Sequence, residues 1–461
     1  MTSALKKGTL NPMKSGFDII GLGLRCLAVA VFALFTGCQP AVSPQPKAAE
    51  TQPSAPPPPA SINPAYVAAH PERWRPVEGE SLNPEGAQDA AAQLEAIGYL
   101  QGSTPPPARS GVLVHDATRT DTGYNLYTSG HAPEAVLMDS EGKPLHVWRK
   151  AFLDVWPELK DTPHQPQMSY WRHVHCFPDG SLLAIFDGIG LIKLDRDSNI
   201  LWKALNQAHH DLDVAPDGDL YVLTRDAHIV PQLHPSAPIL EDYFGVLSSD
   251  GKEKKRVSLL ECLSHSDKPA LLDACKGRAG DLFHTNAIRW LDGRSAGLRP
   301  EFSKGRLLTS IRELDAVAVI DLEQARAVWV FQEKFKRQHD PTLLENGHLL
   351  LFDNRGPVSG SAVLEFDLAN LQRVWTFEGS TARPFYTESC GSAQRLANGN
   401  TLILESDRGH AFELTPDGTV VWEFFNPHRA GERQQFIATL FQLERISAAQ
   451  VAFLEARPTS G

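Results

Sequence analysis

Short apolar runs alternate with polar turns along most of the chain from Gly111 onward. Many of these runs have a period of two residues and are broken by an Asp-Gly or Asn-Gly pair, as at Gly180, Gly218, Gly347 and Gly399. The pattern is typical of β-hairpins, because such pairs readily adopt the conformation of a tight turn. Helical periodicity is largely missing between residues 111 and 425. The sequence therefore predicts an all-β fold built of short strands.

A second recurring element is an acidic turn followed by a strand that ends in tryptophan. Its members are Trp148, Trp202, Trp329, Trp375 and Trp422. The last three are 46 and 47 residues apart, which is the repeat length of a propeller blade with about four short strands. We count six units, beginning near residues 111, 170, 208, 283, 337 and 389, of which the third lacks the tryptophan. We therefore predict a six-bladed β-propeller over residues 109–425, because a β-sandwich or two small barrels would not repeat so regularly.

The C-terminal segment, residues 426–461, has a different pattern. Apolar residues between positions 436 and 454 recur at helical spacing. We expect a short C-terminal helix there, packed against the outside of the propeller.

The first 37 residues have the pattern of a signal peptide. A basic leader is followed by apolar residues 26–35, a run too short to span a membrane but of the length of a signal-peptide core. Thr36, Gly37 and Cys38 then resemble a bacterial lipobox, with Cys38 as the lipidated residue; an ordinary secretory signal with a chance cysteine is the alternative. The sequence predicts an exported protein, lipid-anchored on the periplasmic side of the outer membrane or at the cell surface.

Residues 38–108 are rich in Pro, Ala, Ser and Gln, with proline runs at 56–59 and 105–107. A segment of this composition buries too little apolar surface to fold alone. We predict a semi-extended tether that contains one short helix at residues 87–100.

Charge and cysteine content narrow the function classes. The net charge of -11 argues against nucleic acid, whose phosphates require Lys and Arg. Because exported proteins often form disulfides, Cys262 and Cys275 are a candidate pair, 13 residues apart in a polar segment. Cys176 and Cys390 could pair too or be buried thiols.

Ionisable residues crowd one position of the repeat. When the units are aligned on their turns, polar residues fill the first three positions of the stretches that begin at Trp171, His209, His284, Gln338 and Cys390. The first strand of each propeller blade lies beside the central axis, so we expect these positions to converge on one pocket. The histidines concerned are His173, His209, His210, His284 and His339.

Packing alone rarely requires so many imidazoles, because buried polar groups are costly unless they are paired. We therefore assign a functional role to His209, His210, His284 and His339, together with Asn286 and Arg312. For His173 and His175 a structural, hydrogen-bonded role is at least as good an explanation.

Several of these stretches resemble the bacterial arylsulfotransferases. They are His209-His-Asp-Leu-Asp213, His284-Thr-Asn-Ala-Ile288, Ser310-Ile-Arg312, and Gln338-His-Asp340 with residues 347–354. The resemblance covers roughly residues 111–425, and residues 130–137 and the tail also resemble that group. It implies a six-bladed propeller that moves a sulfuryl group from one phenolic ester to another phenol without a nucleotide donor or other cofactor.

The resemblance also implies roles for individual residues. His339 would be the nucleophile that becomes sulfated, and His284, Asn286 and Arg312 would contact the sulfuryl oxygens. Either His209 or His210 would complete the ring, and we favour His210 because His-Asp recurs at His339-Asp340. Asp340-Pro341 departs from the small residues expected after the nucleophile, which leaves the exact activity open.

The residue types suit the chemistry that the resemblance implies. An aryl sulfate is an anion, so a neutral imidazole is a suitable nucleophile. Arg312 and Asn286 would stabilise charge on the sulfuryl oxygens, and a second histidine would act first as general acid and then as general base. The expected kinetics are ping-pong. Phe385 and Tyr386 either hold the aromatic rings or belong to the core.

Three other functions compete with this one. Three imidazoles suit zinc or copper, although His173-x-His175 is the one closely spaced pair. A quinoprotein-like dehydrogenase would need more blades and a basic cofactor pocket. The main alternative is a non-catalytic envelope lipoprotein that binds partners through its strand edges. We predict an aryl sulfate donor and a phenolic acceptor, with no metal, cofactor or nucleic acid. The sequence does not determine the oligomeric state.

Overall fold

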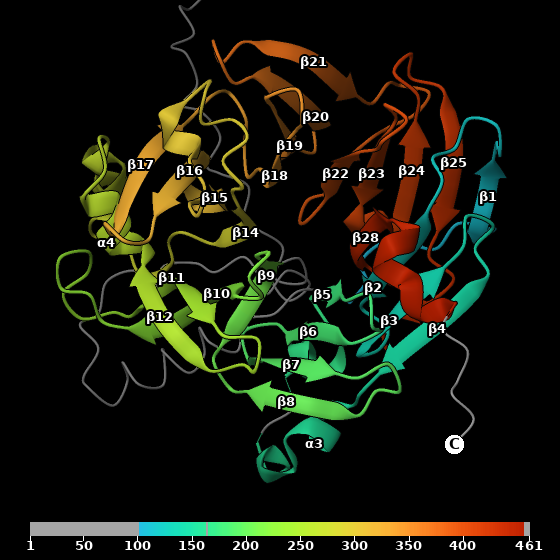
Figure 1. The fold of residues 1–461 in the computed structure, drawn as a ribbon, viewed down its shortest axis with the longest axis horizontal. Coiled ribbons are helices and arrows are strands. Elements are labelled where there is room, and N and C mark those ends of the chain that lie inside the picture. The colour runs from blue at the N-terminus through green and yellow to red at the C-terminus, as the bar shows by residue number, and fades with distance from the viewer. Residues whose placement is uncertain (1–100, 163–164, 456–461) are drawn as a thin grey trace, which may run out of the picture. The chain divides into compact units, whose positions relative to one another are not determined.

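Six antiparallel sheets stand around a central axis in a computed structural model that describes residues 101–162 and 165–455 (Figure 1). This confirms the predicted six-bladed propeller. The predicted signal peptide, Cys38 and the helix at residues 87–100 lie outside the described residues, as does the tether up to residue 100, and they stay predictions.

Five of the blades have four strands each in their main path, and the sixth has five. Blade one contains β2 (Tyr124–Ser129), β3 (Glu134–Met138), β4 (Pro144–Arg149) and β28 (Leu440–Ile446). Blade two contains β5 (His173–Cys176), β6 (Leu182–Phe186), β7 (Gly190–Leu194) and β8 (Ile200–Ala204). Blade three contains β9 (Ala208–Val214), β10 (Leu220–His228), β11 (Ile239–Leu247) and β12 (Glu253–Ser258), with the short β13 (Gly280–Asp281) beside β11.

Blade four contains β14 (Thr285–Trp290), β15 (Leu307–Ile311), β16 (Ala316–Asp321) and β17 (Arg326–Phe331). Blade five contains β18 (His339–Leu343), β19 (His348–Gly356), β20 (Gly360–Asp367) and β21 (Arg373–Glu378). Blade six contains β22 (Ser392–Arg395), β23 (Thr401–Glu405), β24 (His410–Leu414), β25 (Val420–Phe425) and β1 (Gly111–His115). The hairpin of β26 (Arg429–Ala430) and β27 (Phe436–Ile437) precedes β28.

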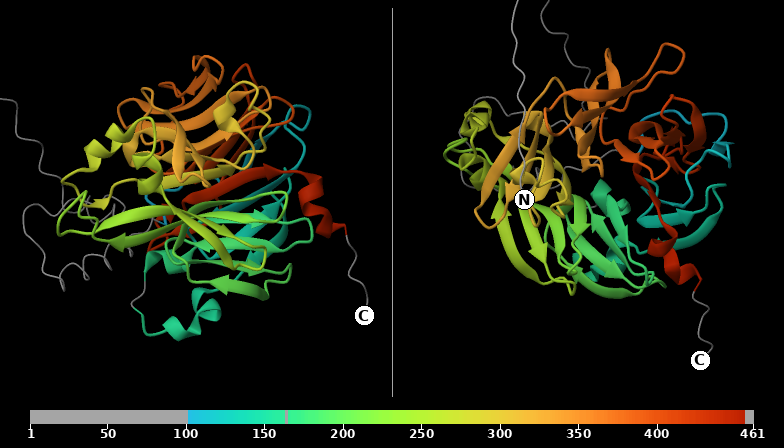
Figure 2. Two further views of the ribbon diagram at one scale, coloured as in Figure 1. Left: turned by 60° about the vertical axis from the view of Figure 1, so that its left-hand side comes forward. Right: turned by 45° about the horizontal axis from the view of Figure 1, so that its top comes forward.

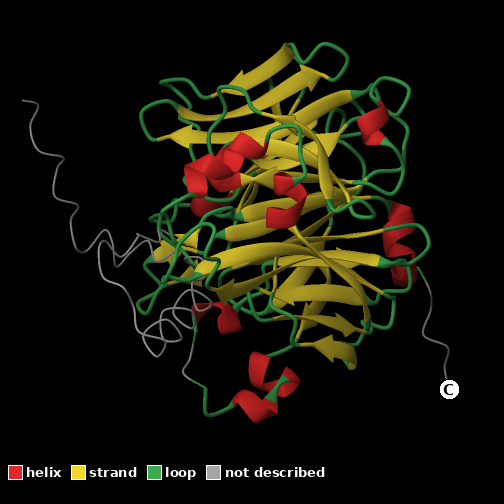
Figure 3. Cartoon of the chain, turned by 90° about the vertical axis from the view of Figure 1, so that its left-hand side faces the viewer, coloured by secondary structure: helices red, strands yellow, loops and turns green. Residues whose placement is uncertain are grey.

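Helices are short and lie outside the sheets (Figure 3). The α-helices are α3 (Phe152–Val155) and α4 (Leu259–Ser264). The 3-10 helices are η1 (Pro157–Leu159), η2 (Pro166–Ser169), η3 (Pro269–Cys275), η4 (Pro300–Phe302), η5 (Arg312–Leu314), η6 (Ser406–Arg408) and η7 (Ala448–Leu454). Within the described residues, no helix is both long enough and apolar enough to cross a membrane.

The two recurring sequence elements have separate places in the blades. The Asp-Gly and Asn-Gly turns join the first strand to the second, and their glycines at 180, 218, 347 and 399 have φ angles of 80–88° that favour glycine. The tryptophans lie on the fourth strand, toward the rim. Three of them donate their indole N–H to a turn carbonyl of the next blade: Trp148 to Gly180, Trp202 to Ser249 and Trp422 to Ser140, at 2.9, 3.1 and 2.8 Å. The repeat therefore encodes contacts between blades as well as within them.

The ring closes through both ends of the described chain. β28 pairs with β2 as the innermost strand of blade one, and β1 pairs with β25 as the outermost strand of blade six (Figure 2). A buried ion pair of 3.1 Å joins Arg445 of β28 to Glu413 of blade six. The predicted count of six units is right, but the strand at residue 111 belongs to the sixth blade rather than the first.

The predicted helix over residues 436–454 is wrong for most of its length. Residues 440–446 form the strand β28. The 3-10 helix η7 covers only residues 448–454 of the predicted helical range. β28 is buried on both faces, so its sequence lacks the alternation that marks a half-buried strand, and its apolar residues imitate helical spacing. Phe453 of η7 packs near Trp148, with ring centroids 5.7 Å apart.

The predicted disulfide between Cys262 and Cys275 is not formed. Both cysteines are free thiols in one hydrophobic cluster, Cys262 on α4 and Cys275 on η3. Burial raises the pKa of Cys262 to about 12 and that of Cys275 to about 11, which suits unreactive thiols that pack as apolar groups. Cys176 and Cys390 are buried free thiols as well.

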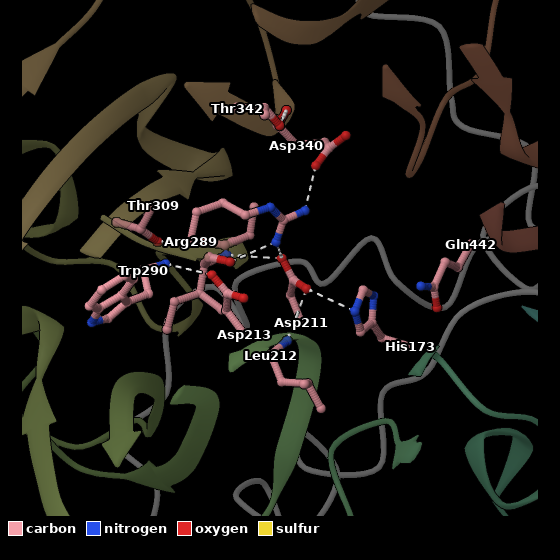
Figure 4. Close-up of polar contacts among 12 residues, drawn as sticks. His173, Asp211, Leu212, Asp213, Arg289, Trp290, Thr309, Asp340, Thr342 and Gln442 are labelled. Atoms are coloured by element: carbon pink, nitrogen blue, oxygen red, sulfur yellow. Dashed lines mark hydrogen bonds and ion pairs between the residues drawn. The ribbon is translucent and has the colours of Figure 1, made fainter. Parts of the chain in front are cut away.

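An ionic cluster ties four inner strands together at the hub (Figure 4). Arg289 of β14 contacts Asp211 of β9 and, at 2.6 Å, Asp340 of β18. His173 of β5 lies 3.3 Å from the other oxygen of Asp211. Nearby, Asp213 accepts the backbone N–H of Trp290 at 2.7 Å. The inner strands of blades two to five are thus linked by side chains.

Charge balance in this cluster depends on the guanidinium. Burial lowers the pKa of Arg289, but Asp211 and Asp340 outweigh burial and raise it, so the group stays charged. Burial raises the pKa of Asp340 to about 6 despite the opposing effect of Arg289. Removal of the arginine would leave buried carboxylates without their cation.

We predict that Cys262 and Cys275 are both labelled when the protein is unfolded in denaturant and alkylated without reductant. Mass spectrometry of the digest checks this, with Cys176 and Cys390 as internal references. The thermal midpoint should not change with reductant, because no bond is there to cut. A cross-linked peptide that contains both residues would contradict the structure.

We predict that Arg289→Met lowers the free energy of unfolding by about 3 kcal/mol or more, because it leaves Asp211 and Asp340 without a partner cation. Arg294→Met is the matched control, since Arg294 pairs with Asp292 at the surface and such pairs contribute less than about 1 kcal/mol. Urea unfolding measures both variants. Equal, small losses would show that the hub cluster does not stabilise the ring.

Candidate active site

A cavity of about 240 Å³ lies among the inner strands at the hub. His210, Asn286 and His339, which the sequence predicted to share a pocket, all line it. Arg172, which precedes β5, and Cys390, which precedes β22, complete this side of the cavity. The structure thus brings together residues from blades three, four and five that are far apart in the sequence.

The three strands that carry these residues share an irregularity. The pairing register shifts at residues 209–211 of β9, at 286 of β14 and at 340–341 of β18. Backbone φ angles of 54°, 49° and 49° at His210, His284 and Asp340 are unusual for residues other than glycine. Such bulges redirect side chains and often lie beside functional sites. The bulge in β18 also accommodates Pro341, which has no N–H for the ladder.

His339 has one ring nitrogen bound and the other available. Its Nδ1 lies 2.6 Å from Oδ1 of Asn354 and 2.9 Å from the carbonyl of Arg337, both of which only accept. Asn354 is oriented by its Nδ2, which donates to the carbonyls of Thr387 and Cys390 at 3.1 and 2.8 Å. His339 therefore carries its proton on Nδ1. Its Nε2 has a lone pair and, although fully buried, no hydrogen-bond partner.

Electrostatics keep this imidazole neutral. Burial lowers the pKa of His339 well below its usual value, and Arg312 and Arg172 act in the same direction against the hydrogen bond that His339 donates to Asn354. Arg312 begins η5 directly after β15, rather than lying on the strand as expected, and donates to Glu313 at 2.7 Å. A neutral imidazole beside two guanidinium groups suits an anionic ligand.

The other three histidines form a hydrogen-bonded chain. His284 Nε2 lies 3.1 Å from His210 Nε2, and His210 Nδ1 lies 2.7 Å from His209 Nδ1. Carboxylates stand at both ends: Asp281 is bonded to His284 Nδ1, and Asp242 lies 3.5 Å from His209 Nε2. We name this set the imidazole chain.

One set of tautomers fits the imidazole chain throughout. His284 donates to Asp281, His210 to His284, and His209 to His210, so His209 Nε2 directs a lone pair toward Asp242. Burial and the charge of Asp281 raise the pKa of Asp242, which suits a protonated carboxyl there. Burial also raises the pKa of Asp281, but the neighbouring His284 and arginines outweigh it, and the net shift is downward.

Asn286 has a clear structural role. Its Nδ2 donates to the carbonyl of Gln338 at 2.9 Å and so positions the backbone just before His339. Its Oδ1 is buried without a hydrogen-bond partner. Asp340, whose role beside the nucleophile was open, contacts Arg289 and the backbone N–H of Ala393. It belongs to the hub cluster, and Asn354 is the residue that orients His339.

The structure separates His173 from His175. They lie two residues apart on β5, and His173 lines the cavity toward Asp211 while His175 packs on Phe177 at 4.8 Å between ring centroids. Phe385 belongs to a hydrophobic cluster of blades five and six, so the core explanation is right for this residue.

Sequence reasoning missed Arg172, Asn354 and the two chain-end carboxylates Asp242 and Asp281. A signal existed for Arg172, because it occupies the same aligned position as His210 and His339. Asn354 lies near the end of β19, a second strand, and Asp242 and Asp281 lie on β11 and β13. The aligned first strands contain no information about these positions.

Comparisons with known proteins place this site in a family. The family model for arylsulfotransferase (ASST) matches residues 173–427, more than half of the chain. The comparison with curated proteins found no match. Among solved structures, a Bacteroides caccae protein of unknown function is 12% identical with a TM-score of 0.44, and covers 66% of this chain and 93% of its own.

A streptogramin B lyase is 11% identical with a TM-score of 0.40, and covers 75% of this chain and 96% of its own. The virginiamycin B lyase from Staphylococcus aureus is 12% identical with a TM-score of 0.38, and covers 70% of this chain and 89% of its own. Similarity at this level says nothing about activity. The extent of the family match is decisive, and the chain belongs to the arylsulfotransferase family.

Proposed function

We propose that this protein transfers a sulfuryl group from an aryl sulfate ester to a phenol through a sulfated His339. The observation that carries the proposal is the buried, unpartnered Nε2 of His339, whose lone pair is fixed by the bond from Nδ1 to Asn354. Membership of the arylsulfotransferase family supports the reaction class.

In the first step, the Nε2 lone pair attacks sulfur and the bond from sulfur to the aryl oxygen breaks. The departing phenoxide takes a proton from His210, the member of the imidazole chain that lines the cavity. The protonated carboxyl of Asp242 replaces that proton through His209, so the chain stays neutral and Asp242 becomes a carboxylate. Arg312 and Arg172, whose charges act on His339, would balance the negative sulfuryl oxygens.

In the second step, the oxygen of the acceptor phenol attacks sulfur and the nitrogen–sulfur bond breaks. The phenol gives its proton back to the imidazole chain, and His339 Nε2 regains its lone pair. Donor ester and acceptor phenol are thereby exchanged for product ester and released phenol, with no other reactant. Because the first phenol leaves before the second reacts, the kinetics are ping-pong.

We predict that His339→Ala reduces sulfuryl transfer from a chromogenic phenyl sulfate to a phenol by at least about a thousandfold, since it removes the nucleophile. His175→Ala is the matched control, an imidazole on another inner strand that does not line the cavity. Release of the chromogenic phenol measures both. No turnover by the unaltered protein with any aryl sulfate would favour a non-catalytic scaffold, and equal turnover by both variants would exclude His339 as nucleophile.

We predict that the acid limb of kcat/KM lies below pH 6.5. The pKa of His339 is lowered in the folded protein, so the neutral, reactive form persists at pH values where an exposed histidine is protonated. Initial rates with phenyl sulfate between pH 4 and 8 check this, since the ester stays anionic throughout. Half-maximal activity at or above pH 6.5 would contradict a buried neutral nucleophile.

A further inference from the structure

A second group of imidazoles lies outside the cavity lining, where the chain passes from blade six toward β28. His131 and Glu134 lie in the connection from β2 to β3 and at the start of β3, and His428 lies between β25 and β26. Each offers one ligand atom, and the three atoms lie within 4.8 Å of one another. Over residues 101–162 and 165–455 this is the one such group of three donors. We propose that it binds a divalent transition-metal ion, with zinc as the best match to its chemistry.

Both the types of ligand and their burial suit a zinc ion. Two imidazoles and a carboxylate are ligands that zinc takes, with a fourth position left for water or a further group. Glu134 is buried, with 3% of its side chain exposed, and the two histidines are partly buried. The ligands come from segments almost 300 residues apart, so they converge only in the folded ring.

His131 is held at both ring nitrogens in the manner of a metal ligand. Its Nε2 faces Oε1 of Glu134 at 2.7 Å, and its Nδ1 faces the hydroxyl of Ser129 at 2.5 Å. Metal-bound histidines usually have such a partner on the nitrogen opposite the ion, where it fixes the orientation of the ring. An ion between His131 and Glu134 would keep the Ser129 contact.

His428 is the group that must move. Its ring stacks on His131 with centroids 3.5 Å apart and planes 5° apart. An imidazole binds a metal in its own plane, so two stacked rings cannot share an ion until one of them turns. His428 has a long contact to the Tyr127 hydroxyl, 3.4 Å from its Nε2, and this weak bond allows the ring to turn.

Arg149 balances the charge when no ion is bound. It contacts Oε2 of Glu134, while 67% of its own side chain is exposed. The guanidinium can therefore return to water at little cost when a divalent cation takes its place. A bound ion would connect blade one to the segment that delivers β28, and would stabilise the closed ring because it binds only the folded state.

The test is zinc binding by the full-length protein, freed of metal by chelator and then dialysed against Zn²⁺ at neutral pH. We expect one equivalent to be retained and the thermal midpoint to rise with Zn²⁺. His131→Gln and His428→Gln should each weaken zinc binding at least tenfold and abolish the rise. His228→Gln is the matched control, because His228 also pairs with a carboxylate, Glu241 at 2.6 Å, but belongs to no group of three donors in the part of the chain that the structure describes.

Two outcomes would overturn the proposal. One is the absence of saturable zinc binding by a protein that circular dichroism shows to be folded. The other is zinc retained equally by His131→Gln and His428→Gln, which would place the ion at the hub histidines instead. This site does not depend on the proposed sulfuryl transfer, since its readouts are metal content and melting temperature.

Discussion

Closure of the ring is the constraint on which the rest of the molecule depends. Propeller blades pack face to face, and the hub positions converge only when the sixth blade meets the first. Here the contact is made by β28, which pairs with β2, and by β1, which pairs with β25. The ion pair of Arg445 and Glu413 adds a buried electrostatic contact across the same seam, which is costly to leave half-made. The cavity, the imidazole chain and the hub cluster are all consequences of that closure.

The hub separates two electrostatic environments along one set of strands. His339 and Asp340 are neighbours, but the histidine meets Asn354 while the aspartate meets Arg289. Other imidazoles gather around His339, whereas the carboxylates of Asp211, Asp340 and Glu444 line the same cavity farther along the inner strands. Burial and the nearby carboxylates of Asp211 and Asp340 together raise the pKa of Glu444 to about 7. Repulsion from these carboxylates would keep the proposed anionic ester near Arg172 and His339, which line the same cavity.

Much of this fold could be predicted because the repeated residues in the sequence make repeated structural contacts in the blades. The turn glycines and the rim tryptophans each make the same contact in several blades, so their spacing in the sequence reflects a spacing in space. The predictions failed where a segment leaves that repeat. β28 is buried on both faces and loses its alternation, and the strand at residue 111 is followed by a blade to which it does not belong. Cys262 and Cys275 lie in a segment that looked polar but contains a buried cluster.

The candidate site divides in the same way. His210, Asn286 and His339 were found because they occupy first strands, which share one geometry around the axis. Asn354 lies in one of the stretches that carry the family resemblance, but its role was missed because it reaches His339 from β19, a second strand. The carboxylates of the imidazole chain come from β11 and β13 and escape detection for the same reason.

Asn354 also marks a chemical weak point. Its amide nitrogen serves two carbonyl oxygens and its amide oxygen serves His339, so the two ends are not interchangeable. Slow loss of ammonia from the side chain, a common form of protein ageing, would replace that nitrogen with oxygen. The resulting carboxylate would repel both carbonyls and favour a protonated ring on His339, which has no lone pair to offer. A preparation could thus lose the lone pair that the proposed reaction requires while every blade remained folded.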